Sequence, residues 1–313
     1  MTIGNTEKKL QTEKDYNEGW ITDYPQIENL IILPCHSVYA PELNREISDL
    51  SNNDRFSKVL DANNWLMASF QKESEDQVSF VKHIEMSLLE LHENIGDSVL
   101  VVTGGYTKPE IEKSESAGYI EVAKSVEFLK NPYFRIGTNI LIEEYARDSY
   151  ENVLYSICTF YKKFNKFPKK ITVVGYGFKK ERFVDSHLAT LGYKDESGEH
   201  VKYVSVGPFY PDKPESMSES DYEEKKQLFW SSLRKSEKTN ALDLFKLNPF
   251  GSKGSKLHEK KEVRDPWNKH VGVSKFYNDN VILNTLIEID DLELNDAMRI
   301  YRTKIEPEFP LYK

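Results

Sequence analysis

The chain has little cysteine, no long apolar run and no excess of positive charge. Two cysteines among 313 residues are too few for a disulfide framework, which indicates a reducing compartment. The formal net charge of −9 argues against non-specific binding to nucleic acid or to an anionic membrane surface. No stretch of about 18 apolar residues occurs, so we expect no span of a membrane.

The first residues are charged and lack the apolar core of a secretory signal. We therefore predict a flexible N-terminal arm over residues 1–27 and a cytoplasmic protein, which could also enter the nucleus. The strongest patterns occupy residues 28–241 and predict an α/β domain. Beyond about Leu242 the periodicity weakens, so residues 242–313 are predicted as a cap over the sheet or a loosely docked extension.

Short apolar runs alternate with helical patterns, which is typical of a mainly parallel sheet covered by helices in a three-layer α/β sandwich. Strands of such a sheet are buried on both faces and read as continuous Val, Ile and Leu. The clearest helix follows Asp148, where apolar residues recur every three or four positions as far as Phe164. Strands are predicted at 30–33, 99–103, 139–143, 171–174 and 203–206, and further helices at 77–94, 115–129, 180–191 and 221–235.

Polar segments follow the predicted strands. Ligands of an open parallel sheet bind outside the carboxyl ends of its strands, near the point where strand order reverses, so we expect these segments to meet along one edge. His36, after the first strand, is a predicted ligand contact. A nucleophile–base pair of His36 with Cys35 is disfavoured, because adjacent residues of an extended segment point in opposite directions.

The second strand runs into Gly104-Gly105, and the next helix opens on Ser114-Glu115. The glycines either form a tight turn or admit a ligand close to the backbone. Ser114 either caps the helix, with Glu115 complementing its dipole, or holds an anionic group together with free amides. All four residues are candidate ligand contacts, and Glu115 is a candidate general base.

The segment Arg147 to Asn152 is densely polar. Asp148 with Glu151 resembles a capping box, which leaves Arg147 and Asn152 without a role. We predict ligand contacts by Arg147, Ser149, Glu151 and Asn152, and Glu151 is the second candidate general base.

Lys179 and Arg182 lie one helical turn apart after the fourth strand, where paired cations suit a phosphate or carboxylate. The alternative is a solvated helix face. The seven histidines show no zinc-ligand spacing, so we predict no metal.

Three segments carry a resemblance to a known family. In order along the chain, "VVTGGYTKPEIEKSES", "EEYARDSYENVLYSI" and "ITVVGYGFKKERF" resemble motifs of the domain-of-unknown-function 218 family, which includes the bacterial YdcF, SanA and ElyC proteins. The likeness is strongest to a fungal cytosolic branch, over about residues 28–269. It implies a Rossmann-like fold, a C-terminal extension that packs on the same domain, and a nucleotide-like ligand such as S-adenosylmethionine. The implied site comprises Gly104, Gly105, Ser114, Glu115, Glu151, Asn152 and Arg182.

The chain departs from that family at two places. The bacterial segment around the first strand is usually rich in glycine, whereas this chain has Pro34-Cys35-His36-Ser37, and many bacterial relatives have a histidine where this sequence has Lys179. Any role that requires an imidazole titrating near pH 7 is therefore in doubt here. The first hypothesis for function is binding of a small anionic or nucleotide-like metabolite. The alternatives are a hydrolase or transferase acting on a phosphorylated or glycosyl substrate, and a non-catalytic interaction protein that uses the segment after Leu242. The sequence does not indicate whether the protein is a monomer or an oligomer.

Overall fold

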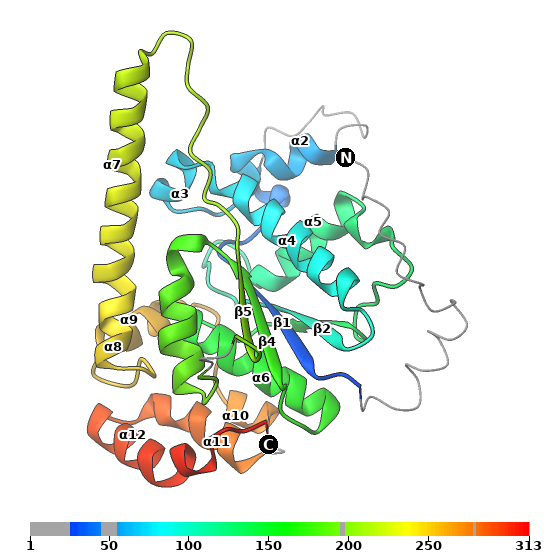
Figure 1. Cartoon of the computed structure of the whole chain (residues 1–313), viewed down its shortest axis with the longest axis vertical. Coiled ribbons are helices and arrows are strands. Elements are labelled where there is room, and N and C mark those ends of the chain that lie inside the picture. The colour runs from blue at the N-terminus through cyan, green and yellow to red at the C-terminus, as the bar shows by residue number, and fades with distance from the viewer. Residues whose placement is uncertain (1–25, 45–54, 195–197, 278–279, 313) are drawn as a thin grey trace.

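The protein is built around a five-stranded, all-parallel sheet in the order β3-β2-β1-β4-β5 (Figure 1). The computed structural model describes residues 26–44, 55–194, 198–277 and 280–312, so the predicted N-terminal arm lies almost wholly outside the described residues. Helices flank both faces, which confirms the predicted Rossmann-like three-layer sandwich. The strands are β1 (Asn29–Pro34), β2 (Ser98–Thr103), β3 (Ile140–Glu143), β4 (Lys170–Gly175) and β5 (Val201–Ser205).

Burial differs between the centre and the edge of the sheet. Every residue of β1 and β2 is buried, as their continuous apolar sequences predict. The edge strand β5 is half-buried or exposed throughout, so the expectation that it is covered on both faces was wrong. It pairs with β4 on one side only, and its charged residue Lys202 reaches Glu90 with an ion pair of 2.7 Å.

One face of the sheet is covered by α4 (Asp76–Glu93) and α5 (Glu115–Ser125), with the short α2 (Arg55–Leu60) and α3 (Ser69–Glu73) beside them. Phe80 of α4 and Tyr119 of α5 pack here against the indole of Trp65. Helix α5 stops earlier than predicted, because Glu127 adopts a left-handed backbone with φ 65°.

The other face is covered by α6 (Ser149–Phe164) and by a π-helical segment, Arg182–Leu188. The sequence predicts an ordinary α-helix at 180–191, so the π geometry is a correction. The predicted stripe of α6 is buried from Tyr150 to Ile157 and half-buried at Tyr161 and Phe164, and Tyr155 is buried as well. This helix is covered on both sides, by the sheet and by the C-terminal residues.

The C-terminal extension belongs to the main core. Phe245, Tyr301 and Ile305 lie in the same apolar cluster as Leu30 and Ile32 of β1. The remaining elements are α7 (Glu219–Glu237), α8 (Asp243–Leu247), α9 (Lys256–Val263), α10 (Val273–Phe276), α11 (Val281–Glu288) and α12 (Leu294–Ile300), with 3₁₀ turns at Pro41–Leu43, Ala62–Asn64, Phe128–Lys130, Gly177–Lys179, Ile289–Asp291 and Glu306–Glu308 and π-helical segments at Lys238–Leu242 and Tyr301–Ile305.

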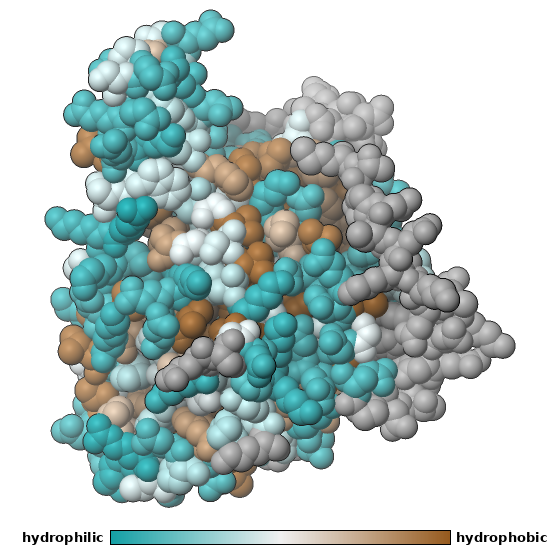
Figure 2. Space-filling view, viewed as in Figure 1, coloured by the Kyte–Doolittle hydropathy of each residue, from teal (hydrophilic) through white to brown (hydrophobic). Residues whose placement is uncertain are grey.

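Helix α7 is long and projects past the body of the molecule (Figure 1). No residue of α7 is buried, and hydrophilic side chains cover most of its projecting end (Figure 2). Its lower end lies beside the carboxyl edge of the sheet, where it contacts the turn Gly177–Lys179. Among the described residues, no helix combines the length and apolarity needed to span a membrane.

Candidate functional site at the carboxyl edge of the sheet

Strand order reverses between β1 and β4, so the segments after these two strands meet where a Rossmann-like sheet binds its ligand. His36 follows β1 and stacks on Tyr176, which follows β4, with ring centroids 5.0 Å apart. His83 of α4 meets the same tyrosine edge-on at 4.7 Å. The Nε2 atom of His36 is buried and has no hydrogen-bond partner in the described part of the chain. The structure therefore brings His36 to the predicted place with an unused polar atom.

Lys179 lies next to these rings. Its ammonium sits 4.8 Å from the ring centroid of Tyr176 and 5.6 Å from that of Phe178. Among the described residues, no carboxylate lies within ion-pairing distance of Lys179. Burial and the positive charges of Arg182 and Arg264 lower the pKa of Lys179 to about 7, against the opposing effect of Glu237.

Arg182 is also half-buried at this edge. Its Nε lies 3.0 Å from Glu237 Oε1, but the two atoms are not aligned as a hydrogen bond. Burial lowers the pKa of Arg182, and Glu237 opposes that shift. The ion pair with Glu237 thus compensates Arg182 only in part.

A third cation, Arg264, comes from the C-terminal extension and was not predicted from the sequence. It follows α9, is exposed, and donates from Nη1 to the carbonyl oxygen of Arg147 at 3.1 Å. Its charge lowers the pKa of both Lys179 and Arg182, so the three cations are near enough to repel one another. The only sequence signal is a basic residue at the end of a short helix, which is too common to be informative.

Glu115, the first residue of α5, lies near enough to Lys179 and Arg264 for their charges to act on its carboxyl group. The hydroxyl of Thr107 donates to Glu115 Oε1. Burial raises the pKa of Glu115, while Thr107, Arg264, Lys108 and Lys179 act in the opposite direction. Glu115 is therefore a carboxyl group at the carboxyl edge whose protonated form is favoured by burial.

The two predicted glycines serve close packing. The amide of Gly104 donates to Glu143 O at 3.1 Å, and that of Gly105 to Ala146 O at 2.8 Å. A Cβ on Gly105 would lie 2.7 Å from Ala146 O. The hypothesis that these two amides receive a phosphate therefore meets a physical obstacle, because both are already used inside the protein.

Ser114 is the N-cap of α5. Its Oγ accepts from Ala117 N at 3.0 Å, and its hydroxyl donates to Glu144 at 2.7 Å. The amides of Glu115 and Ser116 donate to the carbonyl oxygens of Gly105 and Gly104. The structure favours the capping alternative, since these first amides of the helix are not free.

Arg147 and Glu151 are joined by a buried bidentate pair. Nη2 and Nε of Arg147 donate to the two carboxylate oxygens of Glu151 at 2.6 and 3.1 Å, and Nη2 also reaches Asp290 at 2.6 Å. The fully buried Lys261 lies 2.7 Å from Asp290, 3.4 Å from Glu151 and 3.6 Å from Asp148. We call Arg147, Asp148, Glu151, Lys261 and Asp290 the buried ion network.

This network leaves Glu151 unsuited to be a general base. Burial raises its pKa, but Arg147 and Lys261 outweigh burial and hold the pKa at about 2. The predicted ligand contacts of Arg147 and Glu151 are replaced by contacts to the C-terminal extension, which supplies Lys261 and Asp290. Asn152 is buried, and its Oδ1 lies 3.1 Å from the hydroxyl of Thr103, beneath the sheet edge.

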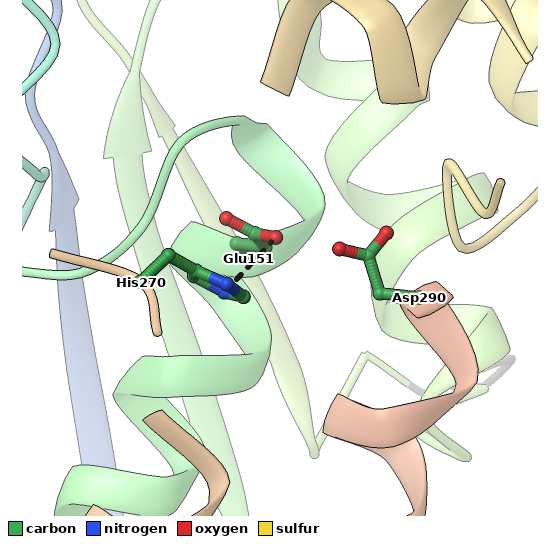
Figure 3. Close-up of side chains that lie close together, drawn as sticks. All are labelled: Glu151, His270 and Asp290. Atoms are coloured by element: carbon green, nitrogen blue, oxygen red, sulfur yellow. Dashed lines mark ion pairs between the residues drawn. The ribbon is translucent and has the colours of Figure 1, made fainter. Parts of the chain in front are cut away.

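A possible set of metal ligands lies at one end of the network. Glu151, His270 and Asp290 converge from three segments, with ligand atoms within 4.8 Å of one another (Figure 3). The guanidinium of Arg147 and the ammonium of Lys261 already contact the same carboxylates. A divalent cation at this point would face two fixed positive charges, so these residues fit a metal poorly.

An open cleft of about 480 Å³ lies beside the network, within the C-terminal extension. Four exposed or half-buried carboxylates line this cleft. Arg147 is the one lining residue that comes from the carboxyl edge of the sheet. The titratable residues of the lining are Arg147, His258, Glu262, Asp265, His270, Glu288 and Asp291. Nothing in the sequence predicts this cleft, because it is formed by segments without clear periodicity.

The two cysteines are free and buried. Burial raises the pKa of both thiols, so neither is a ready nucleophile. Cys35 and His36 do not pair, in agreement with the expectation for adjacent residues.

Comparison with known proteins gives one informative similarity. The chain is 26% identical over 279 residues to the uncharacterized protein YOR238W of Saccharomyces cerevisiae, covering 77% of this chain and 84% of the yeast protein. No family model matches the chain. No solved structure matches it. Membership of the family named above therefore stays a prediction, while the similarity to a fungal protein is a finding.

Proposed function

We propose that the protein binds a small anionic, nucleotide-like metabolite at the carboxyl edge of the sheet, over β1 and β4. One observation carries the proposal: Lys179, Arg182 and Arg264 repel one another, and of the three only Arg182 has a carboxylate within ion-pairing distance in the described part of the chain. Lys179 and Arg182 are partly buried, and partly buried positive charges that repel each other are unfavourable unless an anion joins them. A bound anion supplies that missing negative charge.

The same charges bear on the kind of ligand. Three cations favour a phosphate-bearing nucleotide over S-adenosylmethionine, because the sulfonium of the latter is itself positive. The Nε2 atom of His36, which is buried without a partner among the described residues, offers a polar contact for the uncharged part of the ligand.

The test measures thermal stabilisation of the purified protein by adenosine 5′-monophosphate and by inorganic phosphate. We expect both to raise the Tm of the wild-type protein, and Arg182→Gln to remove that shift while the variant remains folded by circular dichroism. Glutamine keeps a hydrogen-bonding group beside Glu237, which limits the cost of the substitution in the free protein.

Two further variants make the result specific. Arg264→Gln changes an exposed residue of the extension and should also weaken the shift. Lys124→Met removes an exposed lysine from the last turn of α5 and should leave the shift unchanged. A shift that survives in Arg182→Gln and Arg264→Gln would overturn the proposal.

A second candidate function rests on Glu115. A carboxyl group with a raised pKa beside three cations has the properties of a general acid or base acting on a phosphorylated substrate. Hydrolysis of p-nitrophenyl phosphate by the wild-type protein, lost in Glu115→Gln without loss of phosphate binding, would support it. Equal rates of hydrolysis by the wild type and by Glu115→Gln would contradict catalysis by Glu115 and would support a binding function only.

The interaction-protein hypothesis receives less support. The apolar residues after Leu242, among them Phe245, Phe250 and Tyr301, are buried in the protein's own core. That segment is therefore used for folding. A chain truncated after Lys235 would lose these core contacts, so it is unsuitable for a binding experiment.

A further inference from the structure

The π-helical segment Arg182–Leu188 places two functional groups on one face. Hydrogen bonds in a π-helix join residues five apart, so Arg182 and His187 lie about one turn from each other. The charge of Arg182 acts on the imidazole of His187, which agrees with this proximity. In an ordinary α-helix, residues five apart point to different sides. The π geometry thus brings His187 towards the cations of the proposed site.

His187 is held rigidly beneath Ser149. The imidazole is fully buried and packs edge-on against Phe245, Phe183 and Tyr150, with centroid distances of 4.5, 5.5 and 6.0 Å. Its Nε2 lies 2.8 Å from Ser149 Oγ. Ser149 is the first residue of α6 and is half-buried, so it is the member of the pair that a ligand can reach.

The surroundings of His187 determine which partner donates the hydrogen bond between His187 Nε2 and Ser149 Oγ. Burial, then Arg182 and Lys261, lower the pKa of His187, so the ring is neutral and is a weak base. Its Nδ1 is buried and lacks a partner among the described residues. An orphaned lone pair is less costly than an orphaned N–H, which favours the tautomer that carries hydrogen on Nε2. His187 then donates to Ser149 Oγ, and the Ser149 hydroxyl hydrogen is free to point elsewhere.

From this geometry we propose that Ser149 donates a hydrogen bond to a terminal phosphoryl group of the ligand, and that His187 is the residue that positions it. The proposal rests on the proposed function, since Arg182 anchors the same anion. Ser149 follows β3, Arg182 follows β4 and Arg264 belongs to the extension, so the donors approach from three separate elements. A phosphoryl group presents three acceptor oxygens in three directions, whereas a carboxylate presents two in one plane. The ligand class is therefore a phosphomonoester.

The test measures binding of inorganic phosphate by calorimetry, with acetate as the planar anion for comparison. Ser149→Ala should weaken phosphate binding about 10- to 100-fold, the effect of losing a hydrogen bond to a charged group. Ser149→Thr keeps the hydroxyl and should bind within about 3-fold of the wild type. Acetate should bind at least about 10-fold more weakly than phosphate.

The positioning role of His187 is tested by comparing its substitutions in the wild-type and the Ser149→Ala backgrounds. His187→Leu should weaken phosphate binding about 5- to 10-fold, but in the Ser149→Ala background it should have no further effect, because its role passes through the hydroxyl. His187→Gln places an amide N–H near the position of Nε2 and should restore most of the binding. A merely structural role would give the same loss in both backgrounds.

The outcomes separate the two proposals. If wild-type protein binds phosphate, and Arg182→Gln loses binding while Ser149→Ala does not, the role of Ser149 is wrong and the proposed function stands. If acetate binds as tightly as phosphate, the assignment of a phosphoryl group is wrong. If the wild-type protein binds neither anion, the proposed function itself fails. A fluorophosphonate that labels Ser149 covalently would contradict the donor role, since it would show an activated nucleophile.

Discussion

Two charged regions lie close together at the carboxyl edge of the sheet and differ in how their charges are compensated. In the buried ion network, two cations contact three carboxylates at 2.6–3.6 Å. Around Lys179, Arg182 and Arg264, the described residues supply one carboxylate, Glu237, at ion-pairing distance. The first region is complete without a ligand, whereas the second lacks negative charge. The comparison teaches that density of charged residues alone does not identify a binding site.

Removing the central cation of the network should have the largest effect. Lys261→Met leaves Asp148, Glu151 and Asp290 with one remaining cation in a buried place, so we expect a loss of about 5 kcal/mol in the free energy of unfolding, measured by urea denaturation. The neighbouring Lys260 is exposed, and within the described part of the chain its ammonium donates only to Asn240 O. Lys260→Met should therefore change stability by no more than about 0.5 kcal/mol. Equal effects of the two substitutions would contradict the comparison.

Acid should weaken the network next. The pKa of Glu151 is about 2 in the folded protein against an ordinary value of 4.5, so its contribution is full above pH 4.5 and is lost as the pH falls towards 2. Glu151→Gln should cost about 3 kcal/mol at pH 7. The difference from the wild type should shrink between pH 4.5 and pH 2. A difference that is constant over this range would show that Glu151 contributes by packing alone.

A smaller loss of stability is expected from a substitution at the contact between the C-terminal extension and the loop that contains Lys108. Trp267 donates from Nε1 to Lys108 O at 2.9 Å. Trp267→Phe removes this bond, keeps an aromatic ring and should lower the free energy of unfolding by about 1 kcal/mol. Phosphate binding should weaken slightly with it, because Lys108 faces the same group of charges. Unchanged stability would show that the bond contributes nothing.

The smallest effect should come from the uncompensated region, and its sign should be opposite. Lys179→Met removes a repelled charge but also the contacts of the ammonium with the rings of Tyr176 and Phe178. The net gain in stability of the ligand-free protein at pH 7 should therefore be well below the value that the pKa shift alone implies, at about 0.5 kcal/mol. The pKa of Lys179 is about 7 when folded and 10.5 ordinarily, so its penalty is full below pH 7 and disappears as the pH rises towards 10.5. The wild type and the variant should therefore converge over that range. A less stable variant would mean that Lys179 has a partner in the free protein.

The fold was largely predictable from the sequence, because buried parallel strands have a local signature. Leu30–Leu33 and Ile171–Val174 are continuous apolar runs, and both lie within strands of the sheet. The π geometry of Arg182–Leu188 was not predictable, since it depends on packing against α6 and α8 and not on a repeat in the residues themselves.

The candidate site was predicted only in part. Lys179, Arg182, His36 and Glu115 do lie at the predicted edge, because the strand they follow fixes their place. The partners of Arg147 could not be found, since Asp290 is 143 residues away in the sequence. Without that partner, the sequence cannot distinguish a residue free to bind a ligand from one committed to the core.

The integration of the extension has a consequence for biosynthesis. Residues between Phe245 and Ile305 cover the side of α6 that faces away from the sheet. While these residues are still unmade, the ring of Tyr155 lacks its contacts with His270 and Tyr277, and the pair of Arg147 with Glu151 lacks Lys261 and Asp290. Complete native packing therefore requires the C-terminal residues, and until they are made the side chains that they cover favour aggregation.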